Sequence, residues 1–185
     1  VRLRVQSAIG GFYNPRALES AIKTIRSEPN PTIINTAMRS LSGYGSSEIG
    51  SILLHYLREP SYRNTHAESA IAAMEKQDNP VFIMPILETL MERKGLFSTR
   101  GMVNALSSLA YLGRHQDDKS MLLSFIAGRL QDPKSAVRSG AIRALAKLKD
   151  PKAIAILEKW MSADSDSPEY KAAQTAINTL RKMAL

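Results

Sequence analysis

The chain has 185 residues, contains no cysteine and carries a formal net charge of +8 at neutral pH. This length suffices for a buried core, and the lack of cysteine excludes disulfides, thiol catalysis and cysteine metal sites. Its apolar stretches, such as residues 81–87, are far shorter than the roughly 20 residues that cross a bilayer. We therefore expect a soluble chain without a membrane partner, and the composition assigns no cellular compartment.

The first predicted element is a helix that starts at once, because Val1, Val5, Ala8, Ile9 and Phe12 recur at helical spacing. Nothing at its start supplies a polar cover for this apolar stripe. We therefore predict that the chain is a piece of a longer protein and that residues 1–28 pack against a preceding domain.

The second predicted helix begins at Asn14-Pro15, and Asn79-Pro80 and Asp150-Pro151 repeat this pair of residues. Asn or Asp can cap a helix, and proline suits the first helical position because it has no amide hydrogen to leave unpaired. Each second helix should bury one apolar face. The predicted faces are Leu18, Ile22 and Ile25; Ile49, Leu53 and Leu57; Ile83, Ile86 and Leu90; Leu122, Phe125 and Ile126; and Ala153, Ile154, Leu157, Trp160 and Met161.

A small residue followed by a large apolar one recurs along the chain at steps of 32 to 36 residues. Alanine or valine stands three residues before each pair, so two columns repeat together and indicate stacked helical hairpins. The pairs are Ala8-Ile9, Ser40-Leu41, Ala73-Met74, Ser108-Leu109, Ala144-Leu145 and Thr179-Leu180.

These columns predict one repeat domain over residues 1–185, with hairpins at about 1–28, 31–59, 62–94, 97–131 and 133–163. A capping helix over 168–185 should close the stack, because it has an apolar face and a polar one. Its predicted core-facing residues are Ala172, Ala176, Leu180 and Met183.

The unit over residues 137–157, with Val137-Arg138, Ala141, Ala144-Leu145, Leu148 and Asp150-Pro151, resembles the HEAT repeat. This resemblance covers essentially the whole chain. It implies an all-α fold, a right-handed α-solenoid of about five and a half HEAT-like hairpins. Proteins of this kind act as scaffolds, adaptors and supports between domains, and in a few lineages as nucleic-acid enzymes.

Residues 62–160 also resemble the C-terminal HEAT-like region of bacterial aminopeptidase N-type zinc metallopeptidases. The residues that carry this narrower resemblance are Met91-Glu92-Arg93-Lys94-Gly95, followed by Arg100, Ala105-Leu106 and Leu109. It implies a region that follows a catalytic domain and packs against it. The functional residues of those enzymes match nothing here.

No motif in the chain predicts catalysis, a metal or a cofactor. His55, His66 and His115 lie in different repeats, and His66-Ala67-Glu68 lacks the second histidine of a zinc peptidase motif. Residues 43–47 follow no predicted strand, so a turn is expected there rather than a phosphate loop. Residues 164–167 alternate carboxylates and hydroxyls but lack the glycine and glutamate of an EF-hand, so we expect a solvated linker.

A possible basic interaction surface lies in the second half of the chain, where most of the positive charge is found. Its candidate residues are Arg143, Lys147, Lys152 and Lys159. Such charge suits the phosphates of a nucleic acid, but the only aromatic residue nearby, Trp160, falls on an apolar stripe and should pack in the core. We therefore predict a non-catalytic repeat domain that packs against the preceding domain of its parent chain or another protein. A free-standing protein scaffold and a nucleic-acid-binding array are the alternatives.

Overall fold

The computed structural model describes residues 1–163 and 167–183, and in this part of the chain every regular element is a helix. Five short 3-10 helices lie between α-helices: η1 (Leu41–Gly43), η2 (Tyr62–Asn64), η3 (Pro80–Phe82), η4 (Lys94–Leu96) and η5 (Arg129–Gln131). The α-helices are α1 (Arg2–Ile9), α2 (Pro15–Ser27), α3 (Pro31–Ser40), α4 (Ser47–Arg58), α5 (Thr65–Gln77), α6 (Ile83–Glu92), α7 (Thr99–Gly113), α8 (Ser120–Gly128), α9 (Ser135–Leu148), α10 (Lys152–Ala163) and α11 (Tyr170–Met183).

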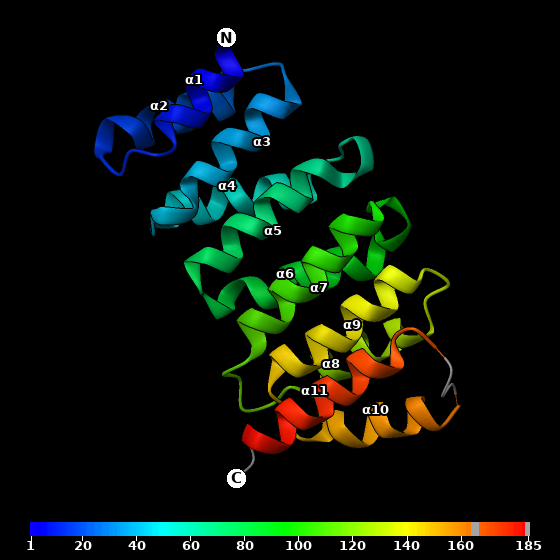
Figure 1. The fold of residues 1–185 in the computed structure, drawn as a ribbon. Helices are drawn as coiled ribbons and strands as arrows, with labels where there is room; N and C mark the ends of the chain where they lie inside the picture. The colour runs from blue at the N-terminus through cyan, green and yellow to red at the C-terminus, as the bar shows by residue number, and fades with distance from the viewer. Residues whose placement is uncertain (164–166, 184–185) are drawn as a thin grey trace. The chain divides into compact units, whose positions relative to one another are not determined.

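The helices follow one another as antiparallel hairpins, which confirms the predicted all-α solenoid of helical hairpins (Figure 1). By their internal contacts the residues fall into two compact units, Val1–Ser98 and Thr99–Leu185. The first unit contains α1 to α6 and the second contains α7 to α11. None of the described helices is both long and apolar enough to cross a membrane.

In the first unit, the first helices of successive hairpins stack on one another. Helix α3 packs against α1 and α2, and α5 packs against α3 and α4. The repeated columns supply this core: Ala37 and Leu41 are fully buried, as are Ala70 and Met74. Small residues let neighbouring helices approach closely, while each large apolar side chain adds about 1.5–3 kcal/mol when it is fully buried.

In the second unit, α9 lies between α7 and α11, and α10 packs against α11 (Figure 1). A side chain at Gly140 of α9 would meet Val103 of α7, because a Cβ atom there would lie 3.0 Å from it. Glycine therefore permits the close approach of these two helices. The column residues Ala105, Leu109, Ala141 and Leu145 are buried beneath this contact.

Side chains cap several helices as the sequence predicted. The Asn14 side chain accepts a hydrogen bond from the Ala17 amide at 3.0 Å, and Pro15 stands at the start of α2. Asp150 accepts one from the Lys152 amide at 2.9 Å, where α10 begins. Asn79 caps the short helix η3 rather than an α-helix, accepting from the Val81 amide.

The structure leaves the apolar stripe of the first helix uncovered and corrects the predicted core faces of four other helices. Val5 and Ala8 of α1 and the flanking Val1 and Phe12 are exposed, and only Gln6 of this helix is buried. Phe125 of α8 and Ile154 of α10 are half-buried rather than buried. In α2 the buried residues are Ala17, Ala21 and Ile25, one turn apart, which leaves Leu18 and Ile22 half-buried on its flank. In α11 the buried face is Ala173, Ala176, Ile177 and Leu180, while Ala172 is half-buried and Met183 at the helix end is 53% exposed.

Candidate interaction surfaces

The three histidines occupy different environments. His55 on α4 is exposed and lies 3.6 Å from Glu59, and His115 follows α7 on an exposed turn. His66 on α5 is buried, and its Nδ1–H donates to Asn35 of α3 at 2.7 Å. Within the described residues, no three His, Asp or Glu side chains come together as metal ligands would.

The buried hydrogen bond between His66 and Asn35 connects α5 to α3. The Tyr56 ring packs edge-on against His66, with 5.4 Å between the ring centroids, and the Tyr56 hydroxyl donates to the Ile25 carbonyl at 2.9 Å. Burial lowers the pKa of His66, although the nearby Glu59 carboxylate acts in the opposite direction. A neutral histidine whose Nδ1–H is already used in a hydrogen bond is suited to packing and not to proton transfer.

A groove lies between α2 and α4 in the first unit. Its larger hollow has a volume of about 570 Å³. An adjoining hollow of about 430 Å³ continues it toward Tyr56 and shares the residues Arg26 and Glu48. These two side chains form an ion pair of 2.9 Å that bridges the helices. The groove therefore runs along both helices, with Leu18 and Ile22 one turn apart in its wall.

The groove was not predicted from the sequence, because Leu18 and Ile22 were assigned to the core. A signal was present in the spacing. Ala17, Ala21 and Ile25 form their own stripe at intervals of four residues, and this stripe alone can fill a core face. Leu18 and Ile22 lie on a neighbouring stripe, which the core does not need and which can therefore line a groove.

The basic candidate residues lie on two different helices of the second unit. Arg143 and Lys147 belong to α9, where Arg143 is exposed and the Lys147 ammonium donates to Ser107 of α7 at 2.9 Å. Lys152 and Lys159 are exposed on α10. The structure thus places Arg143 and Lys147 one turn apart on α9 and the other two lysines on the next helix, α10.

Of three other predicted features, the structure places two. Residues 43–47 form a turn that leads from η1 into α4, with Ser46 capping α4 through the Ile49 amide at 3.3 Å. Trp160 is 8% exposed, and its indole N–H donates to the Leu130 carbonyl at 3.2 Å, which confirms its core position. Of the acidic segment predicted to be a solvated linker, residues 164–167, the first three lie outside the described residues.

Comparison with known families agrees with this architecture. The family model described as HEAT repeats matches residues 101–181, which is most of the second unit. None of the curated proteins compared matches the chain. The comparisons give no support for the narrower resemblance to zinc aminopeptidases. The chain is therefore an all-α helical-repeat protein, and its residues 101–181 are similar to HEAT repeats.

Proposed function

We propose that the chain is a non-catalytic scaffold and that the groove between α2 and α4 binds an amphipathic helix of another protein. The groove is the observation that carries this proposal. Its two hollows fall in the size range of pockets that accept apolar side chains. An apolar wall with a polar rim is the arrangement by which helical grooves hold a partner helix.

The rim of the groove defines the partner further. Lys23 and Arg26 stand on α2, while Glu19 and Glu48 contribute negative charge to the same lining. A partner helix should therefore carry apolar residues three or four positions apart, with charges of both signs beside them. The hydrophobic contacts would supply the affinity, and the charges would select the orientation.

The groove proposal can be tested with helical peptides selected from a display library on the wild-type chain. Selected peptides should bind at least about tenfold more weakly to Ile22→Glu and Leu18→Glu, because a buried apolar contact is replaced by a charge. Val81→Glu is a matched control, since Val81 is 61% exposed in the same unit and outside the groove. Circular dichroism must show that each variant is folded. Peptides that bind all three variants equally would contradict the proposal.

We also propose, from the resemblance to aminopeptidases, that the first hairpin docks on another domain of a larger protein. The exposed apolar side chains of α1 and the turn after it support this proposal. Val5 is 51% exposed, Phe12 is 64% exposed and Tyr13 is 74% exposed, although Tyr13 stacks on Tyr44 with 4.6 Å between ring centroids. A His-Glu-x-x-His domain encoded in frame before Val1 would support this arrangement, and a coding sequence without any neighbouring domain would exclude it.

A further inference from the structure

One face of the second unit carries positive charge without any acidic residue. The helices α7, α9 and α11 lie side by side and run in the same direction, with α9 in the middle (Figure 1). The described acidic residues of this unit lie instead in the connections between helices and on α10. Every charged residue of the three helices is basic: Arg100, Arg138, Arg143, Lys147, Lys171, Arg181 and Lys182.

Some of these cations are already engaged. Arg138 pairs with the buried Glu169 at 2.8 Å, and Arg181 pairs with Glu158 of α10 at 2.6 Å. Lys147 is held at Ser107 and lies over the Tyr111 ring, 5.0 Å from its centroid. These contacts hold the side chains of Arg138, Arg181 and Lys147 in place.

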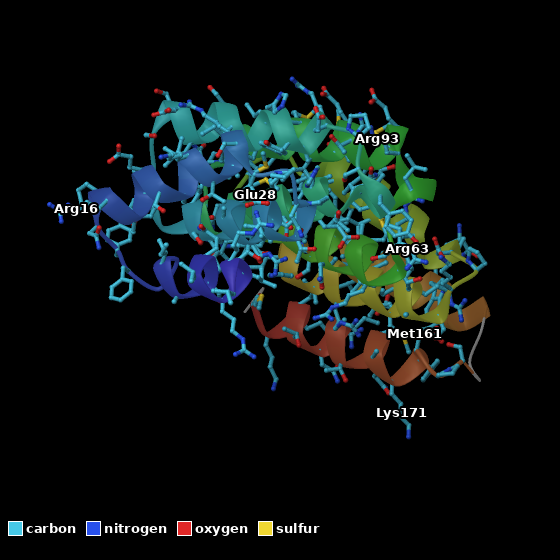
Figure 2. The ribbon with its side chains drawn as sticks, turned by 90° about the horizontal axis from the view of Figure 1, so that it is seen from above. Arg16, Glu28, Arg63, Arg93, Met161 and Lys171 are labelled. Atoms are coloured by element: carbon cyan, nitrogen blue, oxygen red, sulfur yellow. The ribbon has the colours of Figure 1, made fainter. Side chains whose placement is uncertain are left out.

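The remaining cations point into solvent. Arg100, Arg143, Lys171 and Lys182 are exposed, and within the described part of the chain no carboxylate forms an ion pair with them. Figure 2 shows the Lys171 side chain extending outward from α11, away from the ribbon. The face therefore offers four cations that a partner could contact without first breaking an internal ion pair.

Helix stability accounts for Lys147, Arg181 and Lys182, which lie in last turns where a positive charge suits the helix dipole, but not for the other basic residues. Arg100, Arg138 and Lys171 lie in the first turns of their helices, where a positive charge opposes the helix dipole. None of the three helices has an acidic residue in that turn. Arg143 and Lys147 are also four residues apart on α9, a spacing at which like charges repel. Basic residues are thus present where stability by itself would favour acidic ones.

We propose that this face, formed by α7, α9 and α11, is a second interaction surface and that its ligand is an acidic segment of a protein. Helices that pack side by side are about 8–10 Å apart, so the face is about 20 Å wide between the outer helix axes. An extended segment of about six residues spans that distance at about 3.3 Å per residue. The Asp and Glu side chains of such a segment could reach Arg143 on α9 and Lys171 or Lys182 on α11.

A protein segment fits this face better than a nucleic acid does. Single-stranded nucleic acids rely on aromatic rings that are open to stacking. Of the two aromatic residues on these helices, Tyr111 is instead covered by the guanidinium of Arg114, which lies 3.6 Å from the ring centroid, and Tyr170 lines a hollow beside Glu158 and Met161 of α10. Trp160 is buried in the core of the same unit. The face thus supplies charge and hydrogen-bond donors but no stacking platform.

This surface can be tested with the whole chain and a fluorescent glutamate-rich peptide, whose glutamine counterpart serves as the neutral probe. The face variant combines Arg143→Gln, Lys171→Gln and Lys182→Gln. The control variant combines Lys134→Gln, Lys152→Gln and Lys159→Gln, which removes the same charge from exposed positions outside the face. Three exposed ion pairs of about 0.5 kcal/mol each correspond to roughly tenfold in affinity. We therefore expect the face variant to bind the acidic peptide about tenfold more weakly, and the control variant less than about twofold.

Several outcomes would overturn the proposal. Equal losses in both variants would mean that the peptide responds only to net charge. The proposal would also fail if the neutral peptide bound as well as the acidic one, because charge would then play no part, or if neither bound at physiological ionic strength. Tighter binding of single- or double-stranded DNA, lost in the face variant, would assign the surface to nucleic acid. The result is independent of the groove between α2 and α4, because Ile22→Glu should leave binding of the acidic peptide unchanged.

Discussion

Among single residues, His66 is a buried polar side chain that should make the stability of the protein depend on pH. It is 8% exposed, and its hydrogen bond to Asn35 satisfies two side chains that would otherwise be costly to bury. Burial lowers the pKa of His66, so the folded state prefers the neutral ring. In the unfolded chain the same ring titrates near its ordinary value of about 6.5.

The pKa difference at His66 predicts how stability depends on pH. Above a pH of about 6.5 the ring is neutral in both states, and its contribution to stability is fully present. As the pH falls below this value, the unfolded state takes up the proton first, so the free energy of unfolding should decrease until the folded-state pKa is passed. Urea unfolding between neutral pH and a pH of about 5 will measure this loss.

Two variants separate the effect of His66 from that of other groups. His66→Gln keeps an amide that can bond Asn35 but cannot titrate, so its stability should change less over this pH range. The matched control is His55→Gln, because the His55 side chain is 65% exposed and lies in the same unit. The free energy of unfolding of this control variant should decrease over the same pH range as much as that of the wild-type chain. An unchanged pH profile in His66→Gln would show that His66 does not contribute.

Among helices, the contact between the starts of α9 and α11 depends on a buried ion pair. Arg138 of α9 lies 2.8 Å from Glu169, which is 1% exposed and directly precedes α11. Burial alone would raise the pKa of Glu169, but hydrogen bonding to Ser135 and the nearby Arg138 hold it below its ordinary value. The ionised carboxylate thus stabilises the fold above its unfolded pKa, and this contribution is lost as the pH falls through the folded pKa.

Replacing Glu169 should therefore destabilise the second unit. We expect Glu169→Gln to lower the free energy of unfolding by about 1.5–3 kcal/mol, the range for hydrogen bonds to charged groups. Glu158→Gln removes the pair with Arg181, whose partners are 59% and 48% exposed, and should cost less than about 1 kcal/mol. Urea unfolding followed by circular dichroism compares the two. Equal losses would contradict an anchoring role for Glu169.

For the molecule as a whole, a repeat array predicts stability that varies from hairpin to hairpin. Each hairpin is stabilised mainly by its neighbours, and opening is easiest where few apolar side chains are buried. Helix α1 buries only Gln6, whereas α5 and α9 bury most of their apolar residues. Local stability should therefore be lowest at the first hairpin.

Amide hydrogen exchange measures this order directly. We expect residues 1–28 to exchange fastest among the hairpins, with α1 less protected than α2. The internal control is α3 in the same unit, which buries five residues and packs against both earlier helices. If α1 and α3 were equally protected, the exposed apolar side chains of α1 would need no partner, and the proposed docking of this hairpin would lose its support.

The sequence by itself determined the helices, the hairpin period and most of the core. Periodicity and capping depend on neighbouring residues, so Asn14-Pro15 and Asp150-Pro151 mark helix starts that the structure confirms. The column of small and large apolar residues likewise marks Leu41, Met74 and Leu145 as buried, because these positions repeat with the hairpins.

Only the tertiary structure decided which flank of each helix is open. Leu18 and Ile22 fit an apolar stripe equally well in the core or in a groove, and the packing of α2 between its neighbours assigns them to the groove. Likewise, the four basic candidates lie close together in sequence, but the structure divides them between α9 and α10 and engages Lys147 at Ser107. Periodicity specifies angular positions around one helix axis, whereas exposure depends on where the neighbouring helices lie. For this reason the interaction surfaces came from the arrangement of the helices and not from any motif.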